Sequence, residues 1–334
     1  MALQERWFEP RLAAGLLPLV PLSALFAALA ASRRLAYRRG WLATRRLPVP
    51  VVVVGNLIVG GAGKTPLTLA LVRELAERGL RPGIVSRGYG GGVTAPLKVR
   101  PDGDAALVGD EPLMLARRAA CPVWIGRDRA AAGVALLAEH PEVDVLLCDD
   151  GLQHYRLARD VELAVFDGRG AGNGWLLPAG PLREPLARLK GVDAVVFNGP
   201  CDSGLAGWAP CSFAMSLQPG AFHRLHDWAQ TCGADALHGR RLHAVAGIGH
   251  PQRFFRTLAD LGLEVKPRPF PDHHRYSRED LAVPPGDVLL LTEKDAVKCP
   301  TDLAGEAWVL PVEAGIPPGL VDLIVEKIRG RKAS

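Results

Sequence analysis

Short apolar runs alternate with segments of helical periodicity along most of the chain, and this alternation predicts a parallel β-sheet flanked by helices. Helices are expected at 64–78, 113–119 and 128–139. The runs expected as strands are β-branched or aliphatic and fall at 51–54, 83–86, 122–125, 143–148, 161–166 and 194–197. Because continuous apolar runs are typical of strands buried on both faces, we expect a mostly parallel, doubly wound sheet between residues 51 and 199.

A weaker alternation of the same kind begins after residue 200. The apolar runs expected as strands there are 242–246, 288–291 and 308–311, and helices are expected at 252–261 and 320–328. We interpret this part as a smaller α/β domain. The sequence therefore predicts an N-terminal segment (1–46), a doubly wound domain (47–200) and a C-terminal α/β domain (201–334).

The first apolar run is followed by a glycine-rich loop and a helix, an order that is typical of nucleotide-phosphate sites. Backbone amides and the helix N-terminus face the anion, the lysine reaches the outer phosphates, and the threonine hydroxyl ligates Mg²⁺. Ile58 stands where the strict motif has glycine, and the flanking strand and helix disfavour a plain glycine turn. The expected nucleotide-binding residues are Ile58, Val59, Gly60, Gly61, Ala62, Gly63, Lys64 and Thr65.

Two adjacent carboxylates, Asp149 and Asp150, follow the apolar run at 143–148. In phosphate-loop proteins an acidic residue at such a strand end holds Mg²⁺ directly or through water. Because neighbouring carboxylates repel each other without a cation, we favour a metal site that includes Thr65 over a simple turn. Gln153 and His154 lie in the same loop.

A second glycine-rich turn, at 87–92, also follows an expected strand. Ligands bind at strand ends in α/β sheets, so this turn is a candidate ligand contact. A flexible crossover loop explains the same glycines equally well.

The N-terminal segment contains a charge-free apolar stretch, Leu12 to Ala31, which is about long enough to cross a bilayer as a helix. Pro18 and Pro21 interrupt it. Aromatic residues of the kind found at membrane interfaces flank it: Trp7, Phe8, Tyr37 and Trp41. Arginines crowd its C-terminal side, which predicts that the rest of the chain lies on the cytoplasmic face: Arg33, Arg34, Arg38, Arg39, Arg45 and Arg46.

Three interpretations of this stretch compete. A cleaved signal peptide is disfavoured, because Glu5 and Glu9 deprive it of a basic start and because a nucleotide-using domain would find no ATP outside the cell. Of the other two, we favour membrane attachment over a buried core helix. Whether the helix spans the bilayer or lies in its interface stays open.

The net charge of +5 and the pI of about 9.0 favour an anionic partner without choosing among a nucleotide, a phospholipid surface and nucleic acid. The few aromatic residues do not interleave with basic ones as a nucleic-acid stacking platform requires, so we expect no nucleic-acid partner. The six cysteines include no CxxC pair, which disfavours a disulfide framework or zinc site and fits a reducing cytoplasm.

Eight short segments carry a resemblance to a known family. They are GNLIVGGAGKTP (55–66), SRGYGG (86–91), GDEP (109–112), DDGLQH (149–154), PAGPLREP (178–185), AGIGHPQRFF (246–255), DHH (272–274) and LTEKDAVKC (291–299). Together with the N-terminal apolar stretch, this ordered set closely resembles the tetraacyldisaccharide 4'-kinases, inner-membrane enzymes of lipid A biosynthesis in Gram-negative bacteria. The resemblance covers nearly the whole chain.

The resemblance implies that the domain at 47–200 is a kinase domain and that ATP with Mg²⁺ phosphorylates the 4'-hydroxyl of a tetraacylated glucosamine disaccharide 1-phosphate, giving lipid IVA. It also implies that the N-terminal helix docks the enzyme on the cytoplasmic face of the inner membrane. Asp110 and His273 would act together as the base for the sugar hydroxyl, with Glu111 and Glu184 as weaker carry-overs. The other residues that it assigns to catalysis are Lys64, Asp150, Gln153 and His154.

A membrane-recruited ATPase or GTPase switch is the main rival interpretation, because it would share the phosphate loop. Val59 stands where dimerising ATPases of that kind carry a signature lysine, and Lys294 comes one place late for a guanine-reading motif. Both departures disfavour a switch. No obligate protein partner is evident, and the acyl-chain specificity, the oligomeric state and the separate roles of the acidic residues stay open.

Overall fold

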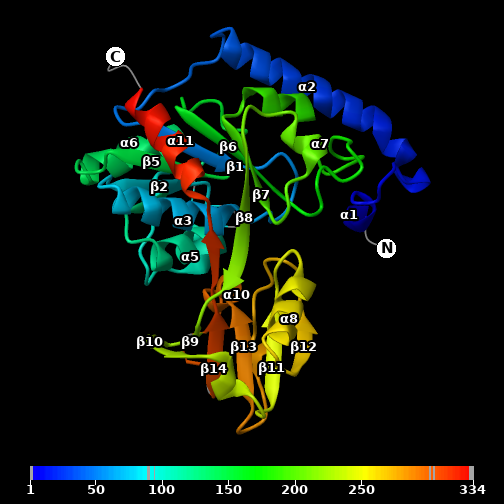
Figure 1. Ribbon diagram of the computed structural model, residues 1–334, viewed down its shortest axis with the longest axis vertical. Coiled ribbons are helices and arrows are strands. Elements are labelled where there is room, and N and C mark those ends of the chain that lie inside the picture. Colours follow the sequence, from blue (N-terminus) through cyan, green and yellow to red (C-terminus); the bar gives the residue numbers. More distant parts are fainter. Residues whose placement is uncertain (1–2, 89–90, 94, 301, 304, 331–334) are drawn as a thin grey trace.

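The computed structural model describes residues 3–88, 91–93, 95–300, 302–303 and 305–330. Two β-sheets organise the molecule. Figure 1 shows the smaller sheet below the larger one, with the long helix α2 (Val20–Arg38) above the larger sheet. Within these residues the larger sheet has nine strands and the smaller sheet has six. The first and last helices of the chain both lie with the larger sheet (Figure 1).

The strand that precedes the phosphate loop, β1 (Val51–Gly55), lies inside the larger sheet between β5 (Val145–Asp149) and β6 (Val161–Asp167). Its neighbours pair in parallel, and among the described residues only the two edge strands, β3 (Leu97–Lys98) and β15 (Val312–Gly315), run antiparallel. The remaining strands are β2 (Pro82–Ser86), β4 (Val123–Ile125), β7 (Ala194–Asn198) and β8 (Ser212–Pro219).

The valines of β1 explain why both faces of this sheet are covered. Because successive side chains of a strand point to opposite faces, Val52 and Val54 enter one apolar core while Val51 and Val53 enter the other. The first core contains α3 (Lys64–Glu77), α5 (Asp110–Arg118) and α11 (Pro318–Arg329), and the second contains α6 (Arg129–Glu139). The predicted doubly wound, mostly parallel sheet is confirmed.

The smaller sheet has four parallel strands, β14 (Glu306–Leu310), β13 (Val288–Thr292), β11 (Leu242–Ala246) and β12 (Val265–Pro269). Antiparallel β9 (Phe222–Arg224) and β10 (Asp227–Cys232) extend it. Phe254, Phe255 and Leu258 of α8 (Pro251–Asp260) pack into its core. The short helical elements of the chain are α4 (Ala105–Val108), η2 (Leu186–Gly191), α7 (Ser203–Ala206), η3 (Ala234–Leu237), α9 (Arg278–Leu281) and α10 (Glu293–Ala296).

The C-terminal part of the chain does not belong to the smaller sheet alone. β8, β15 and α11 come after residue 200, yet they complete the larger sheet and its first core. We expected the last helix to close the smaller domain, and that expectation is wrong, because Leu320, Val321 and Ile324 give α11 an apolar face that packs on the larger sheet. β8 is largely exposed, so it lacks the apolar run that identified the other strands. The division at residue 200 stays a prediction.

The N-terminal apolar stretch forms a 3-10 turn, η1 (Ala14–Leu19), followed by the long helix α2 (Val20–Arg38); α1 (Leu3–Arg6) precedes them. Pro21 lies in the first turn of α2, where a missing amide costs nothing. The span Ala14–Arg38 is long and apolar enough to cross a membrane, and only 11% of its most apolar window is buried. Its exposed leucines are Leu17, Leu22, Leu25, Leu29 and Leu35.

This exposure argues against the buried core helix that we kept as an alternative. α2 is nevertheless tied to the larger domain, because the Ser23 hydroxyl donates a hydrogen bond to the Leu176 carbonyl at 2.8 Å. Trp7 is not an interfacial residue as expected, because it is buried and its indole donates to the Pro178 carbonyl at 3.0 Å. Trp41 remains exposed.

Candidate active site

The phosphate loop connects β1 to α3 and needs glycine at two positions. Gly60 and Gly63 have φ angles of 92° and 98°, a region that side chains disfavour. A Cβ atom on Gly63 would also lie 2.8 Å from Met215 Cε. Ile58 is buried and its backbone pairs with Leu182, so its side chain fills the core and the loop begins after it.

Three side chains hold the carbonyl groups of this loop. Asn56 donates to the Gly60 carbonyl at 3.1 Å, Arg169 to the Gly61 carbonyl at 2.8 Å, and Asn198 to the Ala62 carbonyl at 3.4 Å. The Val59 amide donates to the Pro181 carbonyl at 2.9 Å. The loop is thus fixed from both sides before any nucleotide binds, as anion recognition by backbone groups requires.

Lys64 and Asp150 meet beside the loop, where Lys64 Nζ lies 3.6 Å from Asp150 Oδ1. Arg183 Nη1 donates to both carboxylate oxygens of Asp150 at 3.1 Å. Burial alone would raise the pKa of Asp150, but the charges of Lys64 and Arg183 outweigh it and lower that pKa to about 2. Asp150 is therefore a carboxylate that already has two cationic partners.

The pKa of Asp149 is shifted in the opposite direction to that of Asp150. Asp149 is buried, accepts a hydrogen bond from the Thr68 hydroxyl at 3.3 Å, and has its pKa raised to about 7 by burial and by the nearby Glu111 carboxylate. The charge of Lys64 only partly offsets these two causes. With the Thr65 hydroxyl, the Asp149 carboxylate offers the hard oxygen donors that Mg²⁺ prefers. Among the described residues no cluster of three or more metal-binding side chains occurs, but Mg²⁺ held by one or two carboxylates and by phosphates needs none.

Gln153 and His154 occupy the loop after β5. Gln153 accepts from Arg183 at 3.3 Å and donates to the Asn56 carbonyl at 3.0 Å, which joins this loop to the phosphate loop. His154 Nε2 accepts the Arg129 amide at 3.2 Å at the start of α6. Burial, followed by the charge of Arg129, lowers the pKa of His154 to about 4, so its imidazole is neutral near pH 7.

Asp110 and His273, far apart in sequence, are in contact. His273 Nδ1 lies 3.0 Å from Asp110 Oδ2 across a separation of 163 residues. Asp110 begins α5, while His273 lies between β12 and α9 with a left-handed φ of 61°. The Asp110 side chain is 13% exposed and that of His273 is 36% exposed, so the imidazole faces solvent while its partner is shielded.

Lys294 connects the segments that carry this pair, and we did not predict its role. Its Nζ lies 3.3 Å from Glu111 Oε1 and 3.1 Å from Asp272 Oδ1, the residues next to Asp110 and His273. In the sequence, Lys294 lies in the LTEKDAVKC segment of the family resemblance and in an unmatched guanine-reading motif, and neither gave it a role. Its contacts come from two distant segments, so no local pattern reveals them.

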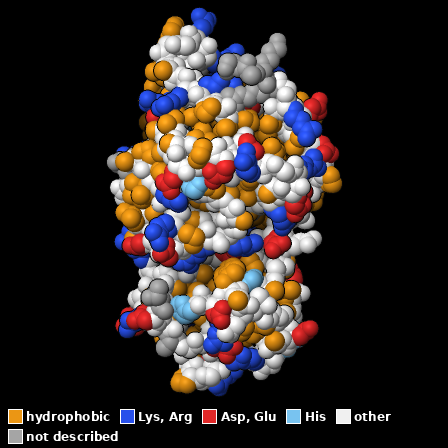
Figure 2. All heavy atoms as spheres, turned by 90° about the vertical axis from the view of Figure 1, so that its left-hand side faces the viewer, with side chains coloured by type: hydrophobic (Ala, Val, Ile, Leu, Met, Phe, Trp, Pro, Cys, Tyr) orange, Lys and Arg blue, Asp and Glu red, His pale blue; other side chains and the backbone are white. Residues whose placement is uncertain are grey.

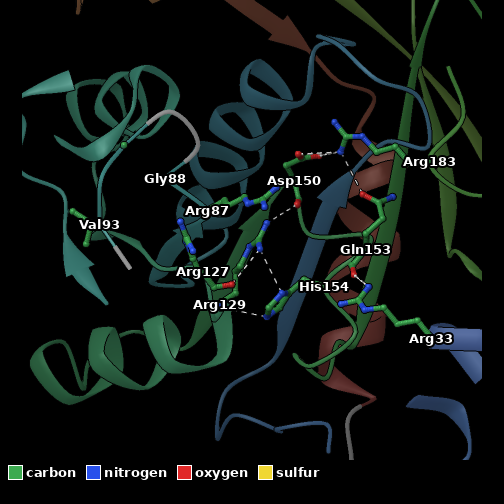
Figure 3. Close-up of a pocket in the computed structure, with 11 residues that line it drawn as sticks. Arg33, Arg87, Gly88, Val93, Arg127, Arg129, Asp150, Gln153, His154 and Arg183 are labelled. Carbon is green, nitrogen blue, oxygen red and sulfur yellow. Dashed lines mark hydrogen bonds and ion pairs between the residues drawn. The ribbon is translucent and has the colours of Figure 1, made fainter. Parts of the chain in front are cut away.

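A cavity of about 610 Å³ opens beside Asp150 (Figure 3). Part of the glycine-rich turn at 87–92 lines it, although Tyr89 and Gly90 of that turn lie outside the described residues. The lining residues are Arg33, Arg87, Gly88, Gly91, Val93, Arg127, Arg129, Asp150, Gln153, His154 and Arg183.

Comparison with known proteins identifies the family. The family model described as tetraacyldisaccharide-1-P 4'-kinase matches residues 16–329. This chain belongs to that family. Tetraacyldisaccharide 4'-kinases of Dechloromonas aromatica and Chromobacterium violaceum are 59% and 53% identical to it, each over 98% or more of both chains.

A solved member of the tetraacyldisaccharide 4'-kinase family has the same fold. The crystal structure of LpxK from Aquifex aeolicus in complex with ATP matches with a TM-score of 0.80 and 30% identity, over 94% of this chain and 99% of that one. The resemblance stated from sequence motifs is therefore confirmed, and the rival placement among ATPase or GTPase switches is not supported.

Proposed function

We propose that this tetraacyldisaccharide 4'-kinase transfers the γ-phosphate of ATP to the 4'-hydroxyl of a tetraacylated glucosamine disaccharide 1-phosphate, giving the 1,4'-bisphosphate lipid IVA. Family membership over residues 16–329 supports the reaction. The observation that carries it at the level of the site is the 3.0 Å contact between His273 and Asp110. Through this contact His273 becomes a candidate general base, in addition to the phosphate loop that would hold ATP.

The geometry of the pair indicates which nitrogen of His273 would act as the base. When the His273 Nδ1–H donates a hydrogen bond to the Asp110 carboxylate, Nε2 is the basic nitrogen and accepts the proton of the sugar hydroxyl. The 4'-oxygen then forms its bond to the γ-phosphorus while the bond between that phosphorus and the β,γ-bridging oxygen breaks, and ADP leaves. The Asp110 carboxylate stabilises the imidazolium that results.

Lys64 and the loop amides hold the transferred phosphate. Phosphoryl transfer requires little covalent help, so positioning and charge supply most of the rate enhancement. Lys64 is held by Asp150, which is in turn fixed by Arg183. These contacts hold the ammonium group beside the loop before ATP arrives.

Thr65 and Asp149 are the residues that would hold Mg²⁺. The ion would supply positive charge to the phosphate oxygens of ATP. The raised pKa of the buried Asp149 carboxylate supports this assignment, because the cation would restore its ionised form. Asp150 fits a ligand role less well, since Arg183 already occupies both of its oxygens.

The enzyme acts at the cytoplasmic face of the inner membrane, where α2 meets the lipid. The exposed leucines of α2 support apolar contact, and the arginines at and beyond its C-terminal end suit anionic headgroups. On the face seen in Figure 2, basic and acidic side chains are interspersed, without the continuous basic surface that a nucleic-acid partner would favour. Leu25→Gln with Leu29→Gln should shift the protein from the membrane to the soluble fraction, and unchanged partition would contradict this docking.

The reaction is tested with γ-labelled ATP and the tetraacyl disaccharide 1-phosphate. Label is expected in a lipid that carries two phosphates, and its position is read by mass spectrometry after mild acid removal of the anomeric phosphate. Label released only as inorganic phosphate, with or without acceptor, would contradict a kinase and favour an ATPase.

A further inference from the structure

The backbone of His273 has a conformation that histidine seldom adopts. Its φ angle of 61° lies in the left-handed region, which a residue with a side chain occupies only where the surrounding structure imposes it. His273 also lies on the connection between β12 and α9, so no regular element fixes its backbone. The contacts made by the segment 270–276 must therefore keep the imidazole beside Asp110.

The start of this segment is attached to the smaller sheet by its backbone. The Phe270 amide donates to the carbonyl of Ala246, the last residue of β11, at 2.8 Å. The ring of His274, the residue next to His273, packs against the rings of Phe270 and Tyr276, with centroids 4.6 and 5.1 Å apart. The position of His273 thus depends on where these two aromatic rings are held.

The end of the segment is attached through one buried carboxylate, that of Asp295 on α10. Asp295 is fully buried, and its Oδ1 accepts a hydrogen bond from the Tyr276 hydroxyl at 2.8 Å. Oδ1 also accepts the amide of Gly247, the residue after β11, at 3.1 Å, and it lies 2.8 Å from Lys298 Nζ. A Cβ atom on Gly247 would lie 2.6 Å from the Tyr276 hydroxyl, so glycine leaves room for this contact. Because a buried carboxylate is costly unless it is paired and hydrogen-bonded, these groups hold one another in a single arrangement.

The same short helix also contacts the element that carries Asp110. Lys294, the residue before Asp295, has its Nζ 3.3 Å from Oε1 of Glu111 on α5. Figure 1 shows α10 at the end of the smaller sheet that faces the larger one. Consecutive residues of α10 thus contact α5 and the segment that carries His273.

We propose that Asp295 and Tyr276 are positioning residues for phosphoryl transfer, because their hydrogen bond holds the segment of His273 in the conformation that brings the imidazole to its carboxylate partner. The inference rests on the proposed function, which makes His273 the base. Burial, followed by the charge of Asp295, raises the pKa of Tyr276, so its hydroxyl stays protonated and remains a donor near neutral pH.

Tyr276→Phe tests this role with a small change, because it removes the hydroxyl and keeps the ring that packs on His274. A lost hydrogen bond to a buried carboxylate corresponds to about a tenfold shift in an equilibrium, here the fraction of molecules in which the pair is assembled. We therefore expect kcat with the lipid acceptor to fall about tenfold, with an unchanged KM for ATP. In the His273→Ala background the same substitution should leave the residual rate unchanged, since Tyr276 acts through the imidazole. An unchanged kcat, or equal losses in both backgrounds, would overturn the proposal.

Asp295→Asn and Asp287→Asn form a matched pair of variants. Asp287 is also a buried carboxylate of the smaller sheet region, but it lies 2.8 Å from His243 at the opposite end of β11. Both substitutions should lower the melting temperature, and only Asp295→Asn should lower kcat by about tenfold or more. Equal effects on kcat would mean that Asp295 serves only the stability of this region, and would overturn the proposal. If Asp295→Asn does not fold, the result for Tyr276→Phe decides.

NMR spectra of protein with ring-labelled histidine separate this inference from the proposed function, because they require no turnover. The His273 signal is identified by its loss in His273→Ala, and Asp110→Ala gives its position without the contact. In Tyr276→Phe the signal should shift toward that position, whereas in Asp287→Asn it should stay in place. An unmoved signal in Tyr276→Phe would overturn the positioning role. If the signal shifts as expected but the unaltered protein phosphorylates no lipid acceptor, the proposed function fails and the positioning contact stands.

Discussion

In the proposed reaction the phosphate loop and the Asp110–His273 pair are two halves of one site, but they are built differently. The loop is a contiguous segment whose carbonyls are held by side chains on or next to strands of the larger sheet. The pair joins residues separated by 163 positions, one on α5 and one beyond β12 of the smaller sheet. The first half is therefore encoded locally, whereas the second exists only when the two sheet regions are in contact.

The two halves should also differ in rigidity, with the phosphate loop more fixed than the Asp110–His273 contact. The loop is anchored next to the buried Ile58 and Ala62, while the imidazole of His273 is partly exposed. Lys294, with Arg118 and Glu293, forms the polar contact between α5 and α10. We infer that nucleotide binding tolerates opening at this contact and that transfer does not, since closure excludes water from the reacting phosphate.

We expect the largest loss of activity from a change in the phosphate loop, the half of the site that is encoded locally. Lys64→Ala should remove the cation nearest the transferred phosphate and lower kcat by about 10²–10³-fold or more, as for other lost transition-state charge partners. The measurement is labelled lipid phosphate formed at saturating ATP, with Arg73→Ala on the exposed face of α3 as control. Near-normal turnover would mean that this loop does not hold the transferred group.

The pair should behave as a unit. Asp110→Ala and His273→Ala are each expected to lower kcat by about 10²–10⁴-fold, the usual contribution of a general base. The double variant should be hardly slower than either single one, because groups that act together lose their effect together. ATP affinity, measured separately, should stay unchanged. Additive losses would reject the coupled pair, and an active His273→Ala beside an inactive His154→Ala would place the base in the loop after β5.

Variants of Lys294 test whether this residue assembles the Asp110–His273 pair, and we expect a smaller loss of kcat from them. Lys294→Met leaves Glu111 and Asp272 facing each other without the cation between them, and the loss of its charged hydrogen bonds should cost about tenfold in kcat. Lys294→Arg should restore most of the rate, and both variants should bind ATP normally. A rise in KM for ATP would show that the contact serves the nucleotide half as well.

The same contrast explains how far the sequence could predict the molecule. The strand β1, the loop and α3 followed from apolar run, glycine spacing and helical period, all of which act over a few residues. The meeting of Asp110 with His273 was expected only from family resemblance. The contacts of Lys294 and Arg129 were not expected, because their partners come from distant segments. α11 was assigned to the wrong sheet for the same reason, since its apolar face does not specify which surface it covers.

The last prediction concerns how the stability of the phosphate-loop half depends on pH. The neutral His154 accepts the Arg129 amide, and burial together with the Arg129 charge lowers its pKa to about 4, against 6.5 in the unfolded chain. Between these values the unfolded chain binds the proton and the folded chain does not, so the free energy of unfolding falls as pH decreases from 6.5 toward 4. Over 6.5 to 5 this contribution is at most about 2 kcal/mol.

His154→Gln keeps an acceptor for the Arg129 amide but removes the titration. In urea unfolding at pH 7, 6 and 5, the unaltered chain should lose more stability than this variant, whereas the exposed His226→Gln should follow the unaltered chain. The binding of ATP, which depends on the loop that Gln153 joins to the same segment, should weaken in parallel with that loss. Identical pH slopes for the unaltered chain and His154→Gln would mean that the imidazole is solvated as in the unfolded chain, and that the nucleotide half is less rigid than its hydrogen bonds indicate.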